Sequence, residues 1–170
     1  MIQKKICMVG AFGVGKTSLV ARFVKGIFSD KYLTTLGVKV DRKAMNVGGQ
    51  ELKLMVWDLA GKDALTEIRP DQLRGAAGYI LVVDGCRGRT LHAAIDLQSL
   101  AEAELGKVPF TCVVNKADLR ESWEVDTAAL EGLSTRGWPV LLTSAKSGEG
   151  VEELFQELAL RLLQEDESHG

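Results

Sequence analysis

The chain has 170 residues, the size of one domain, and a net charge of −2 from 21 basic and 23 acidic residues. This charge excludes a strongly basic surface, so no nucleic acid is expected as a partner. Hydrophobic residues make up 46% of the chain, which excludes intrinsic disorder and suffices for a core without disulfides or a structural metal. The three cysteines are odd in number and far apart, which favours reduced thiols in the cytoplasm.

The ends of the chain bear on membrane attachment. No apolar run approaches the roughly 18 residues that a membrane span needs, and the first residues are not a signal peptide. The last residues, 165–170, are acidic and contain no cysteine for prenylation. We therefore expect a cytoplasmic monomer without an intrinsic membrane anchor. The alternative is that a longer protein carries a lipidated tail beyond this sequence.

The first half of the chain predicts a strand, a helix and a hairpin. The apolar run 6–9 is typical of a short buried strand, and residues 15–25 have helical spacing of their apolar positions. Strands are expected at 38–47 and 52–57 on either side of Gly48-Gly49, a pair that suits a tight hairpin turn. The strand at 38–47 is then antiparallel to its neighbour and lies at an edge of the sheet.

The second half alternates apolar runs with amphipathic segments. The runs are typical of buried parallel strands and lie at 79–83, 111–114 and 140–142. Helical segments are expected near 90–105, 126–136 and 150–164. This alternation predicts an α/β fold with a mostly parallel sheet and helices on both faces. We expect one domain over residues 1–164, followed by a short acidic tail at 165–170.

A glycine-rich loop follows the first predicted strand. Residues 10–17 read Gly-Ala-Phe-Gly-Val-Gly-Lys-Thr and fit G-x-x-x-x-G-K-[ST] between a strand and a helix. Such glycines let backbone N–H groups surround a phosphate chain, and the helix N-terminus adds positive field. Lys16 can supply charge to the outer phosphates, and the Thr17 hydroxyl can ligate Mg²⁺. The alternative, a glycine-rich turn beside an exposed lysine, is disfavoured by the flanking elements.

Three weaker polar signals follow predicted strands. The Asp58 carboxylate can hold Mg²⁺ through water, and the Gly61 N–H can reach a terminal phosphate. In Asn115-Lys116-Ala117-Asp118, the carboxylate can accept hydrogen bonds from guanine N1–H and N2–H₂, whereas adenine N1 is an acceptor and would repel it. A backbone N–H of Ser144-Ala145-Lys146 can donate to guanine O6. Taken singly, each signal also fits an ordinary polar loop after a strand.

The four signals in this order resemble the Ras-like small GTPases, with spacing closest to the Rab branch, over nearly the whole chain. The resemblance implies a P-loop small G domain with a six-stranded, mostly parallel sheet, one antiparallel edge strand and five helices. It implies GTP or GDP and Mg²⁺ bound at the carboxyl ends of the strands. It also implies a switch, in which Thr35 and Gly61 contact the γ-phosphate and its Mg²⁺ and order two loops that hydrolysis releases.

The resemblance also implies roles for individual residues. Phe28 corresponds to the aromatic that packs edge-on against guanine. The implied nucleotide contacts are Gly13, Val14, Gly15, Lys16, Thr17, Ser18, Phe28, Thr35, Gly61, Asn115, Lys116, Asp118, Ser144, Ala145 and Lys146. The implied Mg²⁺ ligands are Thr17, Thr35 and Asp58. The implied catalytic residues are Lys16, Thr35, Gly61 and Lys62.

Lys62 departs from the family pattern, because glutamine usually stands there and orients the attacking water. A lysine ammonium donates hydrogen bonds but cannot accept a proton, so we expect slow GTP hydrolysis. Two alternatives stay open: Lys62 stabilises the leaving charge itself, or it faces solvent. A different function also stays open, an interaction module that holds GTP or GDP without turnover. Lys62 and the bulky Phe12 in the phosphate loop favour that alternative.

Regulatory and effector proteins are expected on residues 30–40, Trp57 and 59–75. Of the hydrophobic surface that Rab proteins present to effectors, Trp57 is kept and is expected to be exposed. Val40 and Gln72 or Leu73 stand where aromatic residues are typical. Some prokaryotic Ras-like GTPases work unanchored, often with roadblock or longin-type proteins, and these suggest the class of partner.

Overall fold

Six strands form a single sheet in the computed structural model, which describes residues 1–26, 38–59 and 69–169. The strands are β1 (Ile2–Gly10), β2 (Val38–Val47), β3 (Gln50–Leu59), β4 (Gly78–Asp84), β5 (Phe110–Asn115) and β6 (Val140–Leu142). Their order in the sheet is β2-β3-β1-β4-β5-β6. Strand β2 is antiparallel to β3, and every other pair is parallel. The predicted α/β class, mostly parallel sheet and antiparallel edge strand are confirmed.

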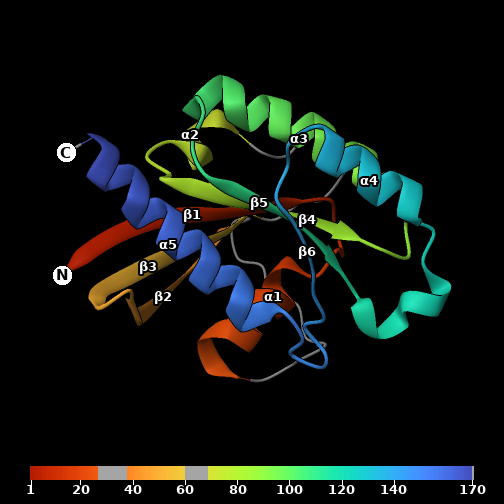
Figure 1. Cartoon of the computed structure of the whole chain (residues 1–170), viewed down its shortest axis with the longest axis horizontal. Helices are drawn as coiled ribbons and strands as arrows, with labels where there is room; N and C mark the ends of the chain where they lie inside the picture. The colour runs from red at the N-terminus through yellow and green to blue at the C-terminus, as the bar shows by residue number, and fades with distance from the viewer. Residues whose placement is uncertain (27–37, 60–68, 170) are drawn as a thin grey trace.

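Helices cover both faces of the sheet, with α1 and α5 on one face and α2, α3 and α4 on the other (Figure 1). The α-helices are α1 (Lys16–Lys25), α2 (Pro70–Leu73), α3 (Arg89–Leu105), α4 (Thr127–Thr135) and α5 (Val151–His169). A short 3₁₀-helix, η1 (Ala117–Ser122), follows β5 and was not predicted. None of the helices in the described part of the chain has the length and apolarity needed to cross a bilayer.

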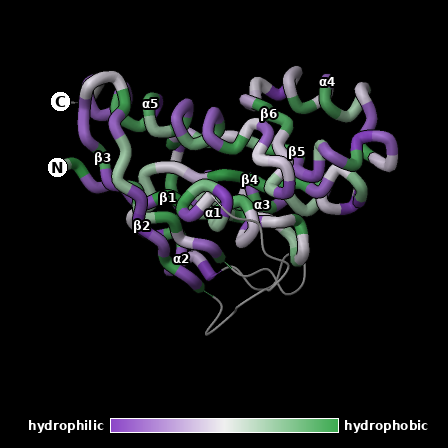
Figure 2. Tube along the Cα trace, turned by 90° about the horizontal axis from the view of Figure 1, so that it is seen from below, coloured by the Kyte–Doolittle hydropathy of each residue, from purple (hydrophilic) through white to green (hydrophobic). Residues whose placement is uncertain are grey.

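The central strands are buried on both faces. Along β1, Ile6 and Met8 pack into the layer with α1 and α5, whereas Cys7 and Val9 pack into the layer with α3 and α4. Successive side chains of a strand point to opposite faces, so a strand covered on both sides reads as an unbroken apolar run. In Figure 2 the trace at β4 is accordingly green, whereas α5 alternates between green and purple. This pattern explains why the sequence located these strands.

The hairpin turn between β2 and β3 has the geometry that the glycine pair suggested. Gly48 has φ 58° and Gly49 has φ 84°, so both are in the left-handed region. A two-residue turn with both φ positive matches the right-handed twist of the flanking strands, and glycine adopts it without strain. Strand β2 is therefore held at the sheet edge in full register from Val38↔Leu59 to Val47↔Gln50.

Helix α5 corrects the expected helix end near residue 164, because it continues through His169. Leu162 and Leu163 are buried near its end, and Asp166 lies 2.5 Å from the Lys4 ammonium on β1. This ion pair gives the acidic end of the helix a partner at the start of the sheet. Residues 165–169, expected as a tail, thus extend the helix.

Candidate nucleotide-binding site

The carboxyl ends of four parallel strands bring the predicted polar segments to one edge of the sheet. Gly10 ends β1, Asp84 ends β4 and Asn115 ends β5, while Asp58 is the penultimate residue of β3. Strand pairing aligns Asp84 with Asn115 and Met8 with Asp58. Ligands of open α/β sheets bind at this edge, so the geometry marks it as the candidate site.

The phosphate loop depends on glycine at two positions. Gly13 has φ 76° and Gly15 has φ 106°, and Gly15 is the N-cap of α1. A side chain at Gly15 would also place its Cβ only 2.3 Å from Asn115 Nδ2. The loop can therefore close against Asn115, in the predicted base-reading segment 115–118, only because Gly15 has no side chain.

Lys16 is 4% exposed, and its ammonium donates to the carbonyls of Gly10 at 2.7 Å and Ala11 at 3.1 Å. Burial lowers the pKa of Lys16 to about 8; Asp58 nearby opposes this effect, and the Arg87 charge adds to it. A buried ammonium that donates only to neutral carbonyls is stabilised when an anion binds beside it. Its environment suits it to a phosphate.

Thr17 and Asp58, which the sequence suggested as Mg²⁺ ligands, are in direct contact. The Thr17 hydroxyl donates to Asp58 Oδ2 at 2.5 Å, and Asp58 is 5% exposed. Burial raises the pKa of Asp58, although the Thr17 hydrogen bond and the Lys16 charge act in the other direction. Asp58 Oδ1 is buried and has no hydrogen-bond partner in the described residues. An unsatisfied carboxylate oxygen beside a hydroxyl has the donor chemistry that Mg²⁺ prefers, so these residues fit the ion.

The described residues contain no group of three or more His, Cys, Asp or Glu side chains that could together hold a metal ion. A site built from one hydroxyl and one carboxylate leaves most coordination positions to water and to a phosphate, which is typical of Mg²⁺ in nucleotide sites.

Asn115 ties the phosphate loop to the last predicted segment. Its amide donates to the Val14 carbonyl at 3.0 Å. Its carbonyl oxygen accepts from Thr143 Oγ1 at 3.1 Å and from the Ala145 N–H at 3.3 Å. The side chain is 2% exposed, so these bonds form away from water and fix three loops together.

The predicted base-reading residues also lie together. Ser144 Oγ donates to Asp118 Oδ1 at 2.7 Å, and Asp118 is exposed on η1, where an incoming base can reach it. Lys116 adopts a left-handed backbone with φ 74°, and its carbonyl accepts from Trp123 Nε1 at 2.8 Å. The Trp123 ring lies against Gly85, where a Cβ would approach it to 2.2 Å. Trp123 therefore packs against the body of the fold.

The remaining predicted site residues have different outcomes. Four of them, Phe28, Thr35, Gly61 and Lys62, lie outside the described residues. Gly13 is exposed on the loop, and Ser18 is half-buried in the first turn of α1. Lys146 is exposed, and its carbonyl accepts a hydrogen bond from Arg22 of α1.

The expected effector surface needs two corrections. The Trp57 ring is half-buried, and the Lys5 ammonium lies 3.7 Å from its centroid. Lys5 also donates to the carbonyls of Gln72 and Arg74, so it holds the end of α2 against the tryptophan. Leu73 is fully buried, so its side chain adds nothing to the exposed surface of residues 69–75.

Sequence reasoning missed Asp84 and Arg87. Asp84 is 1% exposed and lies 2.8 Å from Lys116 Nζ and 3.0 Å from Arg87 Nε. The signal was present, because Asp84 follows an apolar strand at the same edge as Asp58. It was overlooked because Asp84 belongs to no phosphate-binding or base-reading motif.

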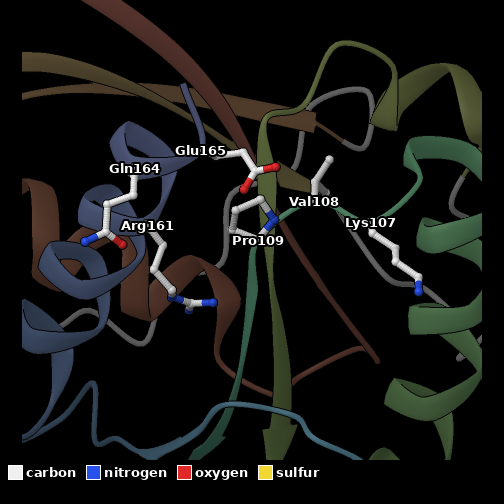
Figure 3. Close-up of a pocket in the computed structure, with 6 residues that line it drawn as sticks. All are labelled: Lys107, Val108, Pro109, Arg161, Gln164 and Glu165. Atoms are coloured by element: carbon white, nitrogen blue, oxygen red, sulfur yellow. The ribbon is translucent and has the colours of Figure 1, made fainter. Parts of the chain in front are cut away.

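A separate hollow of about 390 Å³ lies away from this site (Figure 3). Pro109 on its floor precedes the first residue of β5, so the hollow is at the amino edge of the parallel strands. Arg161 of α5 donates there to the Phe110 carbonyl at 2.9 Å and to Thr111 Oγ1. In the view of Figure 3, Arg161 and Lys107 extend to opposite sides of Pro109 and do not converge. The hollow therefore has no role in the nucleotide site.

Comparison with known proteins agrees with this geometry. The Ras family model matches residues 5–164 of the chain. Ras-related protein Rab-21 of Geodia cydonium is 35% identical over 165 residues, which cover 96% of this chain and 72% of that protein. Ras-related protein Rab-30 of Homo sapiens is 36% identical over 163 residues, covering 95% of this chain and 80% of that protein. Rab-21 of Mus musculus is 33% identical over 162 residues, covering 94% and 73%.

Proposed function

The chain belongs to the Rab branch of the Ras family of small GTPases, and on this premise we propose that it is a guanine-nucleotide switch that hydrolyses GTP slowly. The observation that supports this proposal best is the convergence of three chemistries at one sheet edge. These are the buried Lys16 ammonium, the Thr17–Asp58 pair and the Asp118–Ser144 pair. The ammonium suits a phosphate, the Thr17–Asp58 pair suits a divalent cation, and the Asp118–Ser144 pair suits a guanine base.

The phosphate chain binds against residues 13–18 in this proposal. Backbone N–H groups of Gly13, Val14 and Gly15 and the helix N-terminus at Lys16 donate to the phosphate oxygens. The Lys16 ammonium then exchanges its carbonyl partners for the outer phosphates, where an anion balances its charge. Ser18 adds contacts from the first helical turn.

The base binds against the loops after β5 and β6. Asp118 accepts from guanine N1–H and N2–H₂, and the backbone of residues 144–146 donates to guanine O6. Adenine presents an acceptor opposite the Asp118 carboxylate. Binding adenine would leave that charged group unpaired, so the site rejects adenine. The Lys116 methylenes lie along the base, and Phe28 packs against its edge.

Thr17, Thr35 and Asp58 would hold Mg²⁺, Thr17 by its hydroxyl and Asp58 by its carboxylate. When bound, the ion neutralises charge that develops on the phosphates during transfer to water. The Lys16 ammonium neutralises part of the same charge, and the Gly61 N–H donates to the γ-phosphate. Residues 30–40 and 59–75 differ between the GTP and GDP states and present that difference to regulators and effectors, with roadblock or longin-type proteins as one candidate class.

Hydrolysis is slow because Lys62 cannot accept a proton from the attacking water. Single-turnover hydrolysis of bound GTP tests this reason. Lys62→Gln should hydrolyse GTP faster than the parent, and an unchanged or lower rate would refute it. Lys62→Ala serves as the second variant, because a rate below the parent would show instead that the ammonium stabilises the transition state, as an arginine finger does.

A module that binds nucleotide without turnover is the second candidate function. Phe12 favours it, because its ring is 52% exposed on the phosphate loop and could keep an activating residue of a partner away from the γ-phosphate. Chromatography of nucleotide released after hours with GTP and Mg²⁺ separates the two. GDP accumulating above a protein-free control supports the switch, whereas intact GTP, with and without candidate partners, supports the module.

A further inference from the structure

Asp84 is a buried carboxylate that holds two cations from different loops. It ends β4 and is 1% exposed. Its Oδ2 lies 2.8 Å from Lys116 Nζ and 3.0 Å from Arg87 Nε, and its Oδ1 accepts from the Cys86 N–H at 2.9 Å. Burial alone would raise the pKa of Asp84, but hydrogen bonds from Lys116, Arg87 and the Cys86 N–H, together with the Lys116 charge, hold it below its usual range. The carboxylate is therefore ionised, and both of its oxygens have hydrogen-bond partners.

One of these cations reaches the phosphate loop. Arg87 donates through Nη2 to the Phe12 carbonyl at 2.7 Å. A Cβ on Gly13 would lie 3.3 Å from the same nitrogen, so the guanidinium lies directly against the loop. A planar guanidinium that bonds a carboxylate at one nitrogen and a carbonyl at another holds the two groups at a fixed separation.

The other cation belongs to the base-reading segment. Lys116 lies two residues before Asp118, and the left-handed backbone at Lys116 is fixed by the bond from Trp123. The turn that carries Asp84 and Arg87 is held in place by Thr90. Thr90 Oγ1 accepts from the Asp84 N–H at 2.9 Å and donates to the Arg87 carbonyl at 2.7 Å. A continuous chain of polar contacts thus runs from Phe12 through Arg87 and Asp84 to Lys116.

We propose that Asp84 is a positioning residue that couples the phosphate loop, through Arg87, to Lys116 of the base-reading segment. The inference rests on the proposed function. It adds that one buried carboxylate, Asp84, positions both the loop that binds the phosphates and the loop that binds the base. Arg87 sets the position of the phosphate loop, and Lys116 sets the position of the base loop. Removing the carboxylate releases both, whereas removing Arg87 releases the phosphate loop alone.

Affinities for GDP and GMP test this division, because GMP lacks the outer phosphate that the loop and Lys16 enclose. Arg87→Gln should weaken GDP binding about tenfold and GMP binding less than about twofold, which is the scale of one charged hydrogen bond. Asp84→Asn should weaken GDP binding about a hundredfold and GMP binding about tenfold, since Lys116 is released as well. Arg89→Gln is the matched control and should leave both affinities unchanged, because Arg89 is exposed at the start of α3, two residues after Arg87.

The double variant Asp84→Asn with Arg87→Gln tests the coupling itself. Its ratio of GDP to GMP affinity should equal that of Asp84→Asn alone, because Arg87 acts through Asp84. A further tenfold fall in that ratio would overturn the inference. An equal loss of GDP and GMP affinity in Arg87→Gln would do so too, since general loosening of the fold affects both ligands alike. If Asp84→Asn does not fold, Arg87→Gln and Arg89→Gln decide alone, because the Arg87 side chain is 32% exposed.

The parent protein separates this inference from the proposed function. A parent that binds GDP no better than ADP removes the proposed function and this inference with it. A parent that prefers GDP, with an Arg87→Gln variant that loses no GDP affinity, removes the inference alone.

Discussion

At the scale of single residues, two buried carboxylates at the same sheet edge have opposite environments. Asp58 and Asp84 lie at the ends of the strands on either side of β1. Burial raises the pKa of Asp58, whose Oδ1 has no partner in the described residues. The pKa of Asp84 is lowered, because Lys116 and Arg87 outweigh the effect of burial. Asp58 is therefore suited to bind a cation, whereas Asp84 is already paired with Lys116 and Arg87 and has a structural role.

The first prediction concerns magnesium and Asp58. Mg²⁺ should stabilise the GDP complex of the parent by about 2–3 kcal/mol at a metal concentration roughly a hundred times the Kd, and chelation should remove that gain. Asp58→Asn should gain almost nothing from Mg²⁺, because a neutral amide is a poor ligand for a hard cation. Thermal unfolding with and without chelator measures both. Asp96→Asn, on the exposed face of α3, is the control and should keep the full gain.

The second prediction is a pH dependence that comes from Asp84. Its folded-state pKa lies below the ordinary value of 3.8, so its contribution to stability is complete above that value and is lost as the pH falls through the lower folded value. The difference in free energy of unfolding between the parent and Asp84→Asn should be constant from about pH 7 to 5 and shrink below about pH 4. Urea denaturation at several pH values measures it. A difference that grows on acidification would contradict the assignment.

At the scale of elements, the sequence predicted the strands and long helices through periodicity but missed the short or polar segments. Strand β1 begins at Ile2 and not at Ile6, because Lys4 and Lys5 find partners in Asp166 and in the carbonyls of Gln72 and Arg74. Such partners lie far away in sequence and leave no local signal. Helices α2 and η1 span only 4 and 6 residues, too few for a periodic pattern to be read.

The third prediction compares two glycines that border α1, both with left-handed backbones. Gly26 has φ 69°, and no atom of the described residues lies within 4 Å of the position that a Cβ would take, so Gly26→Ala should cost about 1 kcal/mol from backbone strain alone. Gly15→Ala adds a clash at 2.3 Å with the Asn115 amide and should cost at least about 3 kcal/mol. It should also abolish GDP binding, because the loop cannot close. Equal costs in urea denaturation would contradict the packing described here.

At the scale of the whole molecule, two layers of helices cover the faces of the sheet, and the candidate site lies at the carboxyl ends of the parallel strands. The layer with α1 and α5 contains Phe155, which is fully buried and stacks on Phe23 with ring centroids 3.9 Å apart. The converging motifs were predictable because each has its own spacing. The contacts among Asp84, Arg87 and Lys116 were not, because they depend on how the loops after β4 and β5 pack together.

The fourth prediction separates stability from binding. Phe155→Ala should cost about 3–5 kcal/mol in the free energy of unfolding, the usual range for a large cavity in a core. Because Phe155 lies outside the candidate site, the folded fraction should bind GDP with nearly the parent affinity. Leu160→Ala, on the same helix and 42% exposed, should cost less than about 1 kcal/mol. A loss of GDP affinity in folded Phe155→Ala would contradict the separation.

The most direct test of the central claim is a calorimetric comparison of GDP with ADP in the parent, Asp118→Ala and Glu121→Ala, the last as an exposed control on η1. We predict that the parent and Glu121→Ala prefer GDP by about 10⁴-fold, the scale expected when the wrong base covers the Asp118 carboxylate and leaves it without a hydrogen-bond partner. Asp118→Ala should lose most of that preference. Equal affinity of the parent for ADP and GDP, or an Asp118→Ala variant that keeps the full preference, would contradict the account.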